Sequence, residues 1–226
     1  MRTQSVGAAV LLGILSVAAM ATSACSSVAP GPAAATPAPT LPADSIAYDQ
    51  LPIHTDRPNP FSGDCSQIAA NQALLSTLQV NPDKSELQVP QNASNDCVLV
   101  TTAGDQIDIA LASPRAGHPD PWQSSWNAPS PGFYPSHFRR LIVLGRYYAV
   151  SQVVDTNLIA CEIDVQTGSP AVFSVAYRSE RFANADLVAN PQQATTIGEQ
   201  LCPQAQRVAE LVLTAIDPGG GSLAAP

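Results

Sequence analysis

The side chains with the most distinctive chemistry in this chain are five cysteines. Cys25 follows an apolar N-terminal segment, whereas Cys65, Cys97, Cys161 and Cys202 are spread through the rest of the sequence. No two of them form a CxxC motif, so the spacing indicates neither a zinc site nor a thioredoxin-like redox centre. We expect no metal ion and no cofactor.

The first 24 residues have the layout of a signal peptide. Arg2 supplies a positive charge, and the uncharged apolar run Val6–Met20 is shorter than the ~20 residues of a membrane span. Ala24 directly before Cys25 resembles the lipobox of bacterial lipoproteins, in which the cysteine thiol receives the lipid. We therefore predict lipidation (palmitate) of Cys25. The alternative is ordinary secretion with a free Cys25.

The other four cysteines predict two disulfide bonds, because an even number in an exported chain is typical of a disulfide framework. Four cysteines allow three pairings. We favour the sequential one, Cys65 with Cys97 and Cys161 with Cys202, which ties each terminal helix to a nearby strand. In the nested alternative Cys65 joins Cys202 and the two strands are bridged to each other.

Catalytic motifs are scarce. The sequence holds no G-x-S-x-G elbow, no H-E-x-x-H and no glycine-rich phosphate loop followed by lysine. His118, Asp120 and Ser124 are the members of one conceivable triad, but such sets arise by chance in polar loops. His54 lies in a linker, and His137 falls in a segment predicted as loop. We expect no catalytic residue and predict that the chain is not an enzyme.

Two pairs of carboxylate residues in the predicted strands are interpreted as part of the solvated face of a sheet. Two carboxylates on one face could also bind a cation or act as acid and base. The arginine pair is read as solvated charge beside a strand, with an anion contact as the alternative. The pairs are Asp105/Asp108, Glu162/Asp164 and Arg139/Arg140.

The elements that position these residues follow from periodicity. A helix is predicted to begin at Asp64, with Gln67 completing a capping box, and to end at Asn81-Pro82-Asp83. A second helix begins near Thr195, and Pro203 suits the first turn of a third. Strands are predicted at 86–89, 97–102, 106–111, 141–144, 147–154, 159–165 and 171–177. These elements predict an α+β fold: a mostly antiparallel sheet of about six strands with an N-terminal and a C-terminal helix.

Residues 114–138 are predicted to be a long irregular connection. Loops of this length inside compact domains are either functional or disordered. Trp122, Trp126, Phe133 and Tyr134 carry more apolar area than a solvated loop needs. Two interpretations remain open: the aromatic side chains cover the sheet, or some of them form a partner surface.

The composition of the chain bears on its partners and on the limits of its domain. The 226 residues carry a net charge of −8, which disfavours nucleic-acid binding. Prolines and alanines dominate residues 25–59, which we interpret as an extended tether. Residues 60–216 form one globular domain, and 217–226 are predicted to be a disordered tail.

The cysteine framework resembles an actinobacterial family. A lipobox-like cysteine, a Pro/Ala tether, cysteines at the first helix and in two strands, and Cys202-Pro-Gln-Ala at the last helix are similar to the domain-of-unknown-function family numbered 3558. The likeness covers about residues 60–216. It implies an exported, mostly lipid-anchored protein and brings no catalytic residue.

These observations predict a cell-envelope lipoprotein on the outer face of the membrane, acting as a binding module for an envelope protein, glycan or lipid. Two alternatives are a carrier of an apolar ligand between sheet and helix and an envelope enzyme with an unrecognised site.

Overall fold

The computed structural model describes residues 56–85, 96–112, 133–155 and 158–223, all within one compact unit. The leader, Cys25 and the 86–89 strand predicted above lie outside these ranges. The elements are α1 (Ser66–Ala69), α2 (Gln72–Thr77), η2 (Pro82–Lys84), β1 (Cys97–Val100), β2 (Gln106–Ala112), β3 (Phe133–Val143), β4 (Tyr147–Asp155), β5 (Ile159–Gln166), β6 (Val172–Arg178), η4 (Glu180–Phe182) and α4 (Gln193–Ile216).

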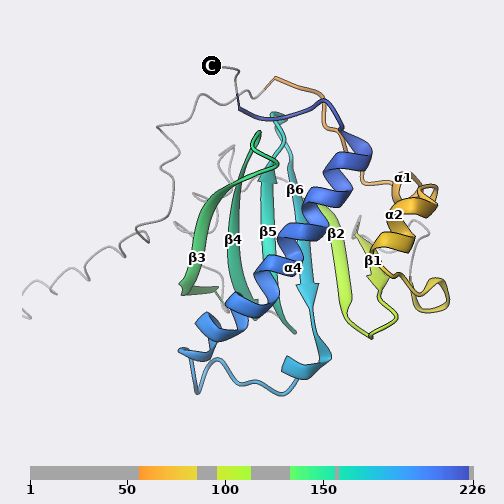
Figure 1. Ribbon diagram of the computed structural model, residues 1–226. Coiled ribbons are helices and arrows are strands. Elements are labelled where there is room, and N and C mark those ends of the chain that lie inside the picture. Colours follow the sequence, from red (N-terminus) through yellow and green to blue (C-terminus); the bar gives the residue numbers. More distant parts are fainter. Residues whose placement is uncertain (1–55, 86–95, 113–132, 156–157, 224–226) are drawn as a thin grey trace, which may run out of the picture. The chain divides into compact units, whose positions relative to one another are not determined.

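Six strands form one antiparallel sheet in the order β1-β2-β6-β5-β4-β3 (Figure 1). The predicted α+β fold is confirmed. The hairpins β1–β2, β3–β4 and β5–β6 each join two strands that the sequence predicts as consecutive elements. In the β3–β4 turn, Leu144 and Gly145 both have positive φ, as a type I′ turn requires.

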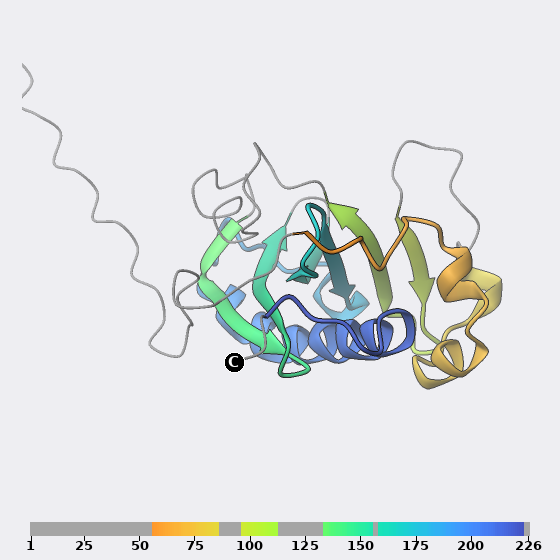
Figure 2. The ribbon, with the colours of Figure 1, turned by 90° about the horizontal axis from the view of Figure 1, so that it is seen from above.

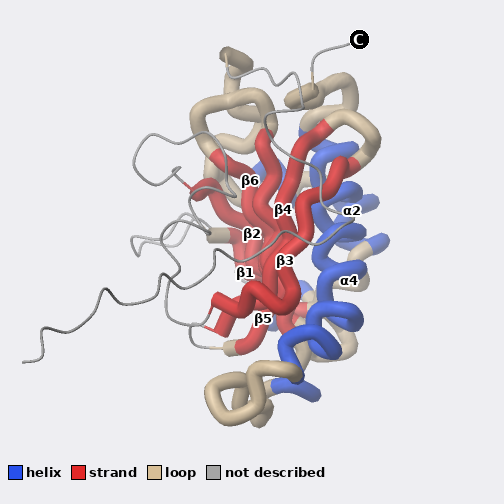
Figure 3. The backbone as a smooth tube through the Cα atoms, turned by 90° about the vertical axis from the view of Figure 1, so that its left-hand side faces the viewer, coloured by secondary structure: helices blue, strands red, loops and turns tan. Residues whose placement is uncertain are grey.

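One face of the sheet is packed against α4 (Figure 2), and Figure 3 shows the strands as one layer beside that helix. Alternate strand residues point to α4, among them Tyr147, Ala149 and Val153 of β4, all fully buried. Leu201 and Val208 of α4 belong to the same core. The sheet and α4 together therefore provide the rigid frame of any site at their border.

Both predicted disulfides are present in the sequential pairing. Cys65 bonds to Cys97, with 5.5 Å between their Cα atoms, and Cys161 bonds to Cys202, with 5.1 Å. The first links the residue before α1 to the start of β1, and the second links β5 to α4. Each bridge thus joins a helical segment to the sheet, as expected.

The N-terminal helix differs from the prediction, because it is broken into α1 and α2. Asn71 interrupts it, and the Asn71 side chain accepts a hydrogen bond from the Leu74 amide (3.0 Å), which caps α2. Asp64 accepts from the Ser66 amide (2.9 Å) rather than from Gln67. The Gln67 side chain instead accepts from the Ser62 amide (3.0 Å), so the predicted capping box does not form.

The C-terminal region also differs, because α4 is a single helix of 24 residues with Pro203 in its interior. Proline has no amide hydrogen for the carbonyl of residue 199, which usually costs about 3 kcal/mol. The helix continues because the buried residues Leu201 and Ala205 flank Pro203, and Cys202 is bonded to β5. Tertiary packing overrides the local signal.

The predicted loop 114–138 is shorter than expected, because β3 begins at Phe133. His137 is therefore part of the sheet and is 6% exposed, not a solvated loop residue. Phe133 and Tyr134 pair with Val154 and Val153 of β4. A register shift lies between Tyr134 and Phe138, and an irregularity of this kind interrupts the regular alternation of a strand.

The predicted disordered tail is wrong for its described part, residues 217–223. Asp217 accepts two bonds from the Arg57 guanidinium, each 3.2 Å long, and one from the Tyr147 hydroxyl (2.8 Å). The Ser222 amide donates to the Arg146 carbonyl (2.9 Å). The folded region therefore extends to Leu223, and it includes Arg57, three residues before the predicted domain start.

Candidate functional site

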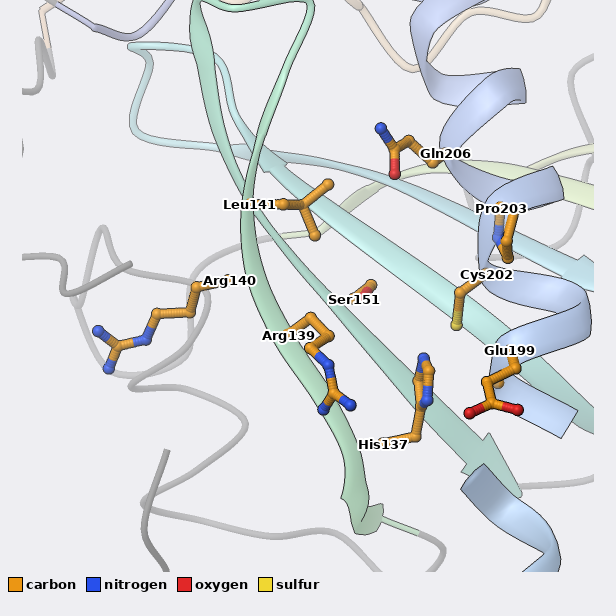
Figure 4. Close-up of a pocket in the computed structure, with 10 residues that line it drawn as sticks. His137, Arg139, Arg140, Leu141, Ser151, Glu199, Cys202, Pro203 and Gln206 are labelled. Atoms are coloured by element: carbon orange, nitrogen blue, oxygen red, sulfur yellow. The ribbon is translucent and has the colours of Figure 1, made fainter. Parts of the chain in front are cut away.

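A pocket of about 280 Å³ lies between β3, at one edge of the sheet, and α4 (Figure 4). We call it the β3–α4 pocket. Ten residues line it: His137, Arg139, Arg140, Leu141, Ser151, Gly198, Glu199, Cys202, Pro203 and Gln206. The strand and the helix contribute opposite walls.

The β3 wall follows from strand alternation. His137, Arg139 and Leu141 are two residues apart, so their side chains share the face that meets α4 (Figure 4). Arg139 is partly exposed, and it donates to the Phe138 carbonyl (2.8 Å). Arg140 points away from this face and is 4% exposed, so the prediction of a solvated arginine pair is wrong for Arg140.

The α4 wall follows from helical spacing. Glu199, Pro203 and Gln206 are three or four residues apart and lie on one side of the helix. Glu199 is exposed and forms no hydrogen bond or ion pair with the described residues. The Gln206 amide nitrogen donates to Glu210 (2.9 Å), and that contact orients the amide group.

The base of the pocket is a close contact between strand and helix. Gly198 has no side chain, and a Cβ atom placed there would lie 2.2 Å from Cγ of His137. The buried imidazole therefore occupies the space that any larger residue would fill. Cys202, bonded to Cys161, and buried Ser151 complete this part of the lining. The disulfide joins the α4 wall to β5, another strand of the same sheet.

A second polar group of side chains lies on the other face of the sheet. We call it the carboxylate cluster: Glu162 and Asp164 on β5, Gln152 on β4 and Ser174 on β6. Ser174 Oγ donates to Glu162 Oε1 (3.1 Å), and Gln152 Nε2 is 3.5 Å from Asp164 Oδ2. Asp164 is 8% exposed, so this pair does not form the predicted wet face. Burial, and then the nearby Glu162 carboxylate, raise the pKa of Asp164 well above its ordinary value.

The other carboxylate pair is occupied with structural contacts. Asp105 lies in the β1–β2 turn and accepts a hydrogen bond from the Tyr177 hydroxyl (2.7 Å). Asp108 forms an ion pair with Arg178 and accepts a hydrogen bond from Gln106 (2.7 Å). These contacts connect β2 and the turn before it with β6.

Several candidate residues lie outside the described ranges: Cys25, His54, His118, Asp120, Trp122, Ser124 and Trp126. Across the described ranges, no three His, Cys, Asp or Glu side chains gather into a group that could hold a metal ion. In the same part of the chain, no helix combines the length and apolar character needed to cross a membrane.

Sequence reasoning missed Gly198, Glu199 and Gln206. The spacing of Glu199, Pro203 and Gln206 marks one helix side once the helix is known to continue through Pro203. Because the proline was taken as a helix start, that side was divided between two elements. The alternation of His137, Arg139 and Leu141 was hidden in the same way, because the strand was predicted to begin at Leu141.

No protein-family model matches the chain, and no curated protein or solved structure matches it.

Proposed function

We propose that this chain is a non-enzymatic, exported lipoprotein that binds its ligand in the β3–α4 pocket at the outer face of the cell membrane. The observation that carries the proposal is the pocket itself, whose two walls present charged side chains from β3 and from α4, the helix that a disulfide joins to β5 of the same sheet. A recess with a few convergent polar groups is the usual form of a ligand site.

Export is supported by the two helix-to-sheet disulfides, since such bonds persist in oxidising compartments. In this proposal the N-terminal segment is the signal peptide that directs export, and Cys25 carries the lipid that anchors the protein to the membrane. Two or three acyl chains on Cys25, at ~0.8 kcal/mol per buried methylene, would hold the protein stably on the bilayer. The similarity of the cysteine framework to the domain-of-unknown-function family numbered 3558 is consistent with this location.

The lining of the pocket favours binding over the alternatives. An apolar carrier needs an enclosed apolar cavity, whereas Arg139 and Glu199 bring charges to this pocket. The disulfide-bonded Cys202 is not available as a nucleophile. We therefore propose ligand binding in preference to the two alternative functions, which are catalysis and the transport of an apolar ligand.

A partner surface next to the pocket is compatible with this function. Phe133 and Tyr134 belong to β3, the strand that also supplies His137 and Arg139. Trp122 and Trp126 remain predicted members of that surface. If they are anchors, exchanging both tryptophans for alanine should abolish capture of the partner and leave the melting temperature unchanged; unfolding or unchanged capture would identify them as a cover for the core.

The anchor is tested by intact mass and detergent-phase partitioning of the mature protein. Wild-type protein should carry lipid mass on Cys25 and enter the detergent phase, and Cys25→Ala should do neither. A mature wild-type N-terminus without lipid would contradict the anchoring.

The pocket is tested by photo-crosslinking in intact cells. A photoreactive amino acid replaces Gln206, which lines the pocket, or Gln204, an exposed residue of the same helix outside the pocket lining. Adducts from position 206 that are absent from position 204 would support a ligand in the pocket. Equal labelling from both positions, or none from 206, would overturn the proposed binding role.

A further inference from the structure

The two disulfides differ in their surroundings. Cys65 and Cys97 are both fully buried, and neither lines the β3–α4 pocket. Cys202 does line that pocket and is 7% exposed, whereas its partner Cys161 on β5 is fully buried. Of the two bonds, Cys161–Cys202 is therefore the one that a molecule in this pocket meets, and it meets the bond at Cys202.

The pocket has room for a small thiol beside Cys202. Figure 4 shows the Cys202 sulfur pointing from α4 toward the sheet, and Ser151 on the sheet side of the lining has a short side chain. The volume of about 280 Å³ is at the lower end of the range for drug-sized ligands, about 300–1,000 Å³. This volume suits a thiol of the size of one amino acid and excludes a folded redox protein.

Access of this kind decides which disulfides react with thiols. A thiolate attacks one sulfur of the bond, and the rate depends on whether that sulfur can be reached. Burial protects Cys65–Cys97 in the folded state, because a thiol reaches neither sulfur until the structure opens. The Cys161–Cys202 bond borders the pocket, so it is open to attack at Cys202 while the domain stays folded.

Complete exchange uses two thiol groups. The first thiolate forms a bond to Cys202 Sγ, the Cys161–Cys202 bond breaks, and Cys161 leaves as a thiolate. The second thiolate attacks the sulfur of the bound thiol, and Cys202 leaves as a thiolate. The two attacking thiols are oxidised to one disulfide, and the protein disulfide takes up their two electrons. The two protons that the attacking thiols released end on Cys161 and Cys202.

The fold accommodates the reduced state. The Glu162 carbonyl oxygen lies 3.9 Å from Cys161 Sγ, so the buried thiol has an acceptor for its weak S–H donor. Leu201 and Ala205 are buried in the core and hold α4 on the sheet without the bond. Reduction therefore frees the α4 wall of the pocket from β5 and leaves the helix in place.

We propose that the β3–α4 pocket is a site of thiol–disulfide exchange, at which a small thiol reduces the Cys161–Cys202 bond by attack on Cys202. This inference goes beyond the proposed binding function, because it adds a reversible covalent reaction that changes how α4 is tied to the sheet.

The test is reduction of the oxidised full chain under native conditions. Free thiols are blocked with N-ethylmaleimide, the excess is removed, and dithiothreitol is added as a small dithiol. Samples taken over time are quenched with acid, labelled with isotopically heavy N-ethylmaleimide and analysed by peptide mapping. We expect Cys161 and Cys202 to be labelled at least about tenfold faster than Cys65 and Cys97, because access governs the rate. The Cys65–Cys97 bond is thus a control within the same molecule.

Urea separates exchange through the pocket from exchange through unfolding. Unfolding exposes both bonds, so a route through the unfolded state accelerates steeply with urea and reduces both bonds together. Exchange through the pocket should change little with urea below the unfolding transition.

Two variants locate the route of the thiol. Gln206→Trp places a large ring in the lining of the pocket and should slow reduction of the Cys161–Cys202 bond several-fold. Gln204→Trp, at an exposed position of the same helix outside the pocket lining, is the control and should react at the wild-type rate.

Four results would overturn the inference: resistance of Cys161–Cys202 to dithiothreitol in the folded protein, reduction of both bonds at equal rates, a steep urea dependence below the unfolding transition, or equal rates in the two tryptophan variants. The first three use only wild-type protein and do not depend on any variant folding.

Discussion

A substitution of Gly198 tests the junction of β3 and α4 most directly. In an ordinary helix interior, Gly→Ala stabilises the protein by about 0.5–1 kcal/mol, because glycine loses more backbone freedom on folding. At Gly198 the added Cβ would stand 2.2 Å from Cγ of His137 and 2.4 Å from Nδ1 and Cδ2 of the same ring. The ring must move, although it is 6% exposed and surrounded by packed atoms. The expected sign is therefore reversed.

The magnitude follows from two opposing contributions. Overpacking a core position costs about 1–3 kcal/mol, and the gain in helix propensity offsets up to about 1 kcal/mol. We expect a net loss of about 1–2 kcal/mol in the free energy of unfolding. In a domain of this size that loss lowers the melting temperature by about 2–8 °C.

Thermal and urea unfolding of the oxidised protein measure this loss, and a double-mutant cycle assigns its cause. In a His137→Ala background the ring is gone, so Gly198→Ala should become neutral or stabilising, with a coupling energy of about 1 kcal/mol or more. Gln204→Ala, at an exposed position of the same helix, should stay within about 0.5 kcal/mol of wild type. Stabilisation by Gly198→Ala in the wild-type background, or an equal effect with and without His137, would refute the close-contact argument.

Three further changes probe other parts of the fold. Burial raises the pKa of Asp164, so above about pH 4 the folded state holds a proton that the unfolded state has released, and stability falls as the pH rises. Asp164→Asn should therefore be more stable than wild type in urea unfolding at pH 7. The difference between the two proteins should shrink toward pH 4. Asp217→Ala removes the acceptor of Arg57 and of the Tyr147 hydroxyl, and a loss of about 1–3 kcal/mol is expected, whereas an unchanged midpoint would show that this contact is dispensable. Paired alanine substitutions of Cys161 and Cys202 open a loop of 41 residues and should cost about 3.9 kcal/mol, and a chain with intact stability would contradict the loop-entropy account.

The parts of the fold that could be predicted from the sequence are those with local signals. Alternation of Ile107 and Ile109 with polar residues indicates a strand, and Gly145-Arg146 indicates the turn before the next strand, so both signals lie within a few residues of the chain. The disulfide pairing was favoured for a similar reason, since each sequential bridge joins a helical segment to a nearby strand.

The parts that could not be predicted depend on tertiary contacts. From the local sequence, Pro203 favours the start of a helix. The helix α4 continues past Pro203 because Leu201 and Ala205 are buried in the core. Asp217 precedes proline and glycine, which predicts a tail, yet Arg57 from the other end of the chain holds it in place.

The candidate site belongs to this second group, because its two walls are about sixty residues apart in the sequence. Neither Arg139 nor Glu199 is unusual alone, since an arginine on a strand and a glutamate on a helix are most often solvated charges. They become a pair because an edge strand and the final helix meet at Gly198, where the missing side chain admits His137. A glycine inside a long helix is the signal that remains in the sequence, because it lowers the stability of the helix unless another group needs its space. Here that group is an imidazole at the base of the pocket, so the residue that weakens the helix is also the one that lets the helix and strand close around a site.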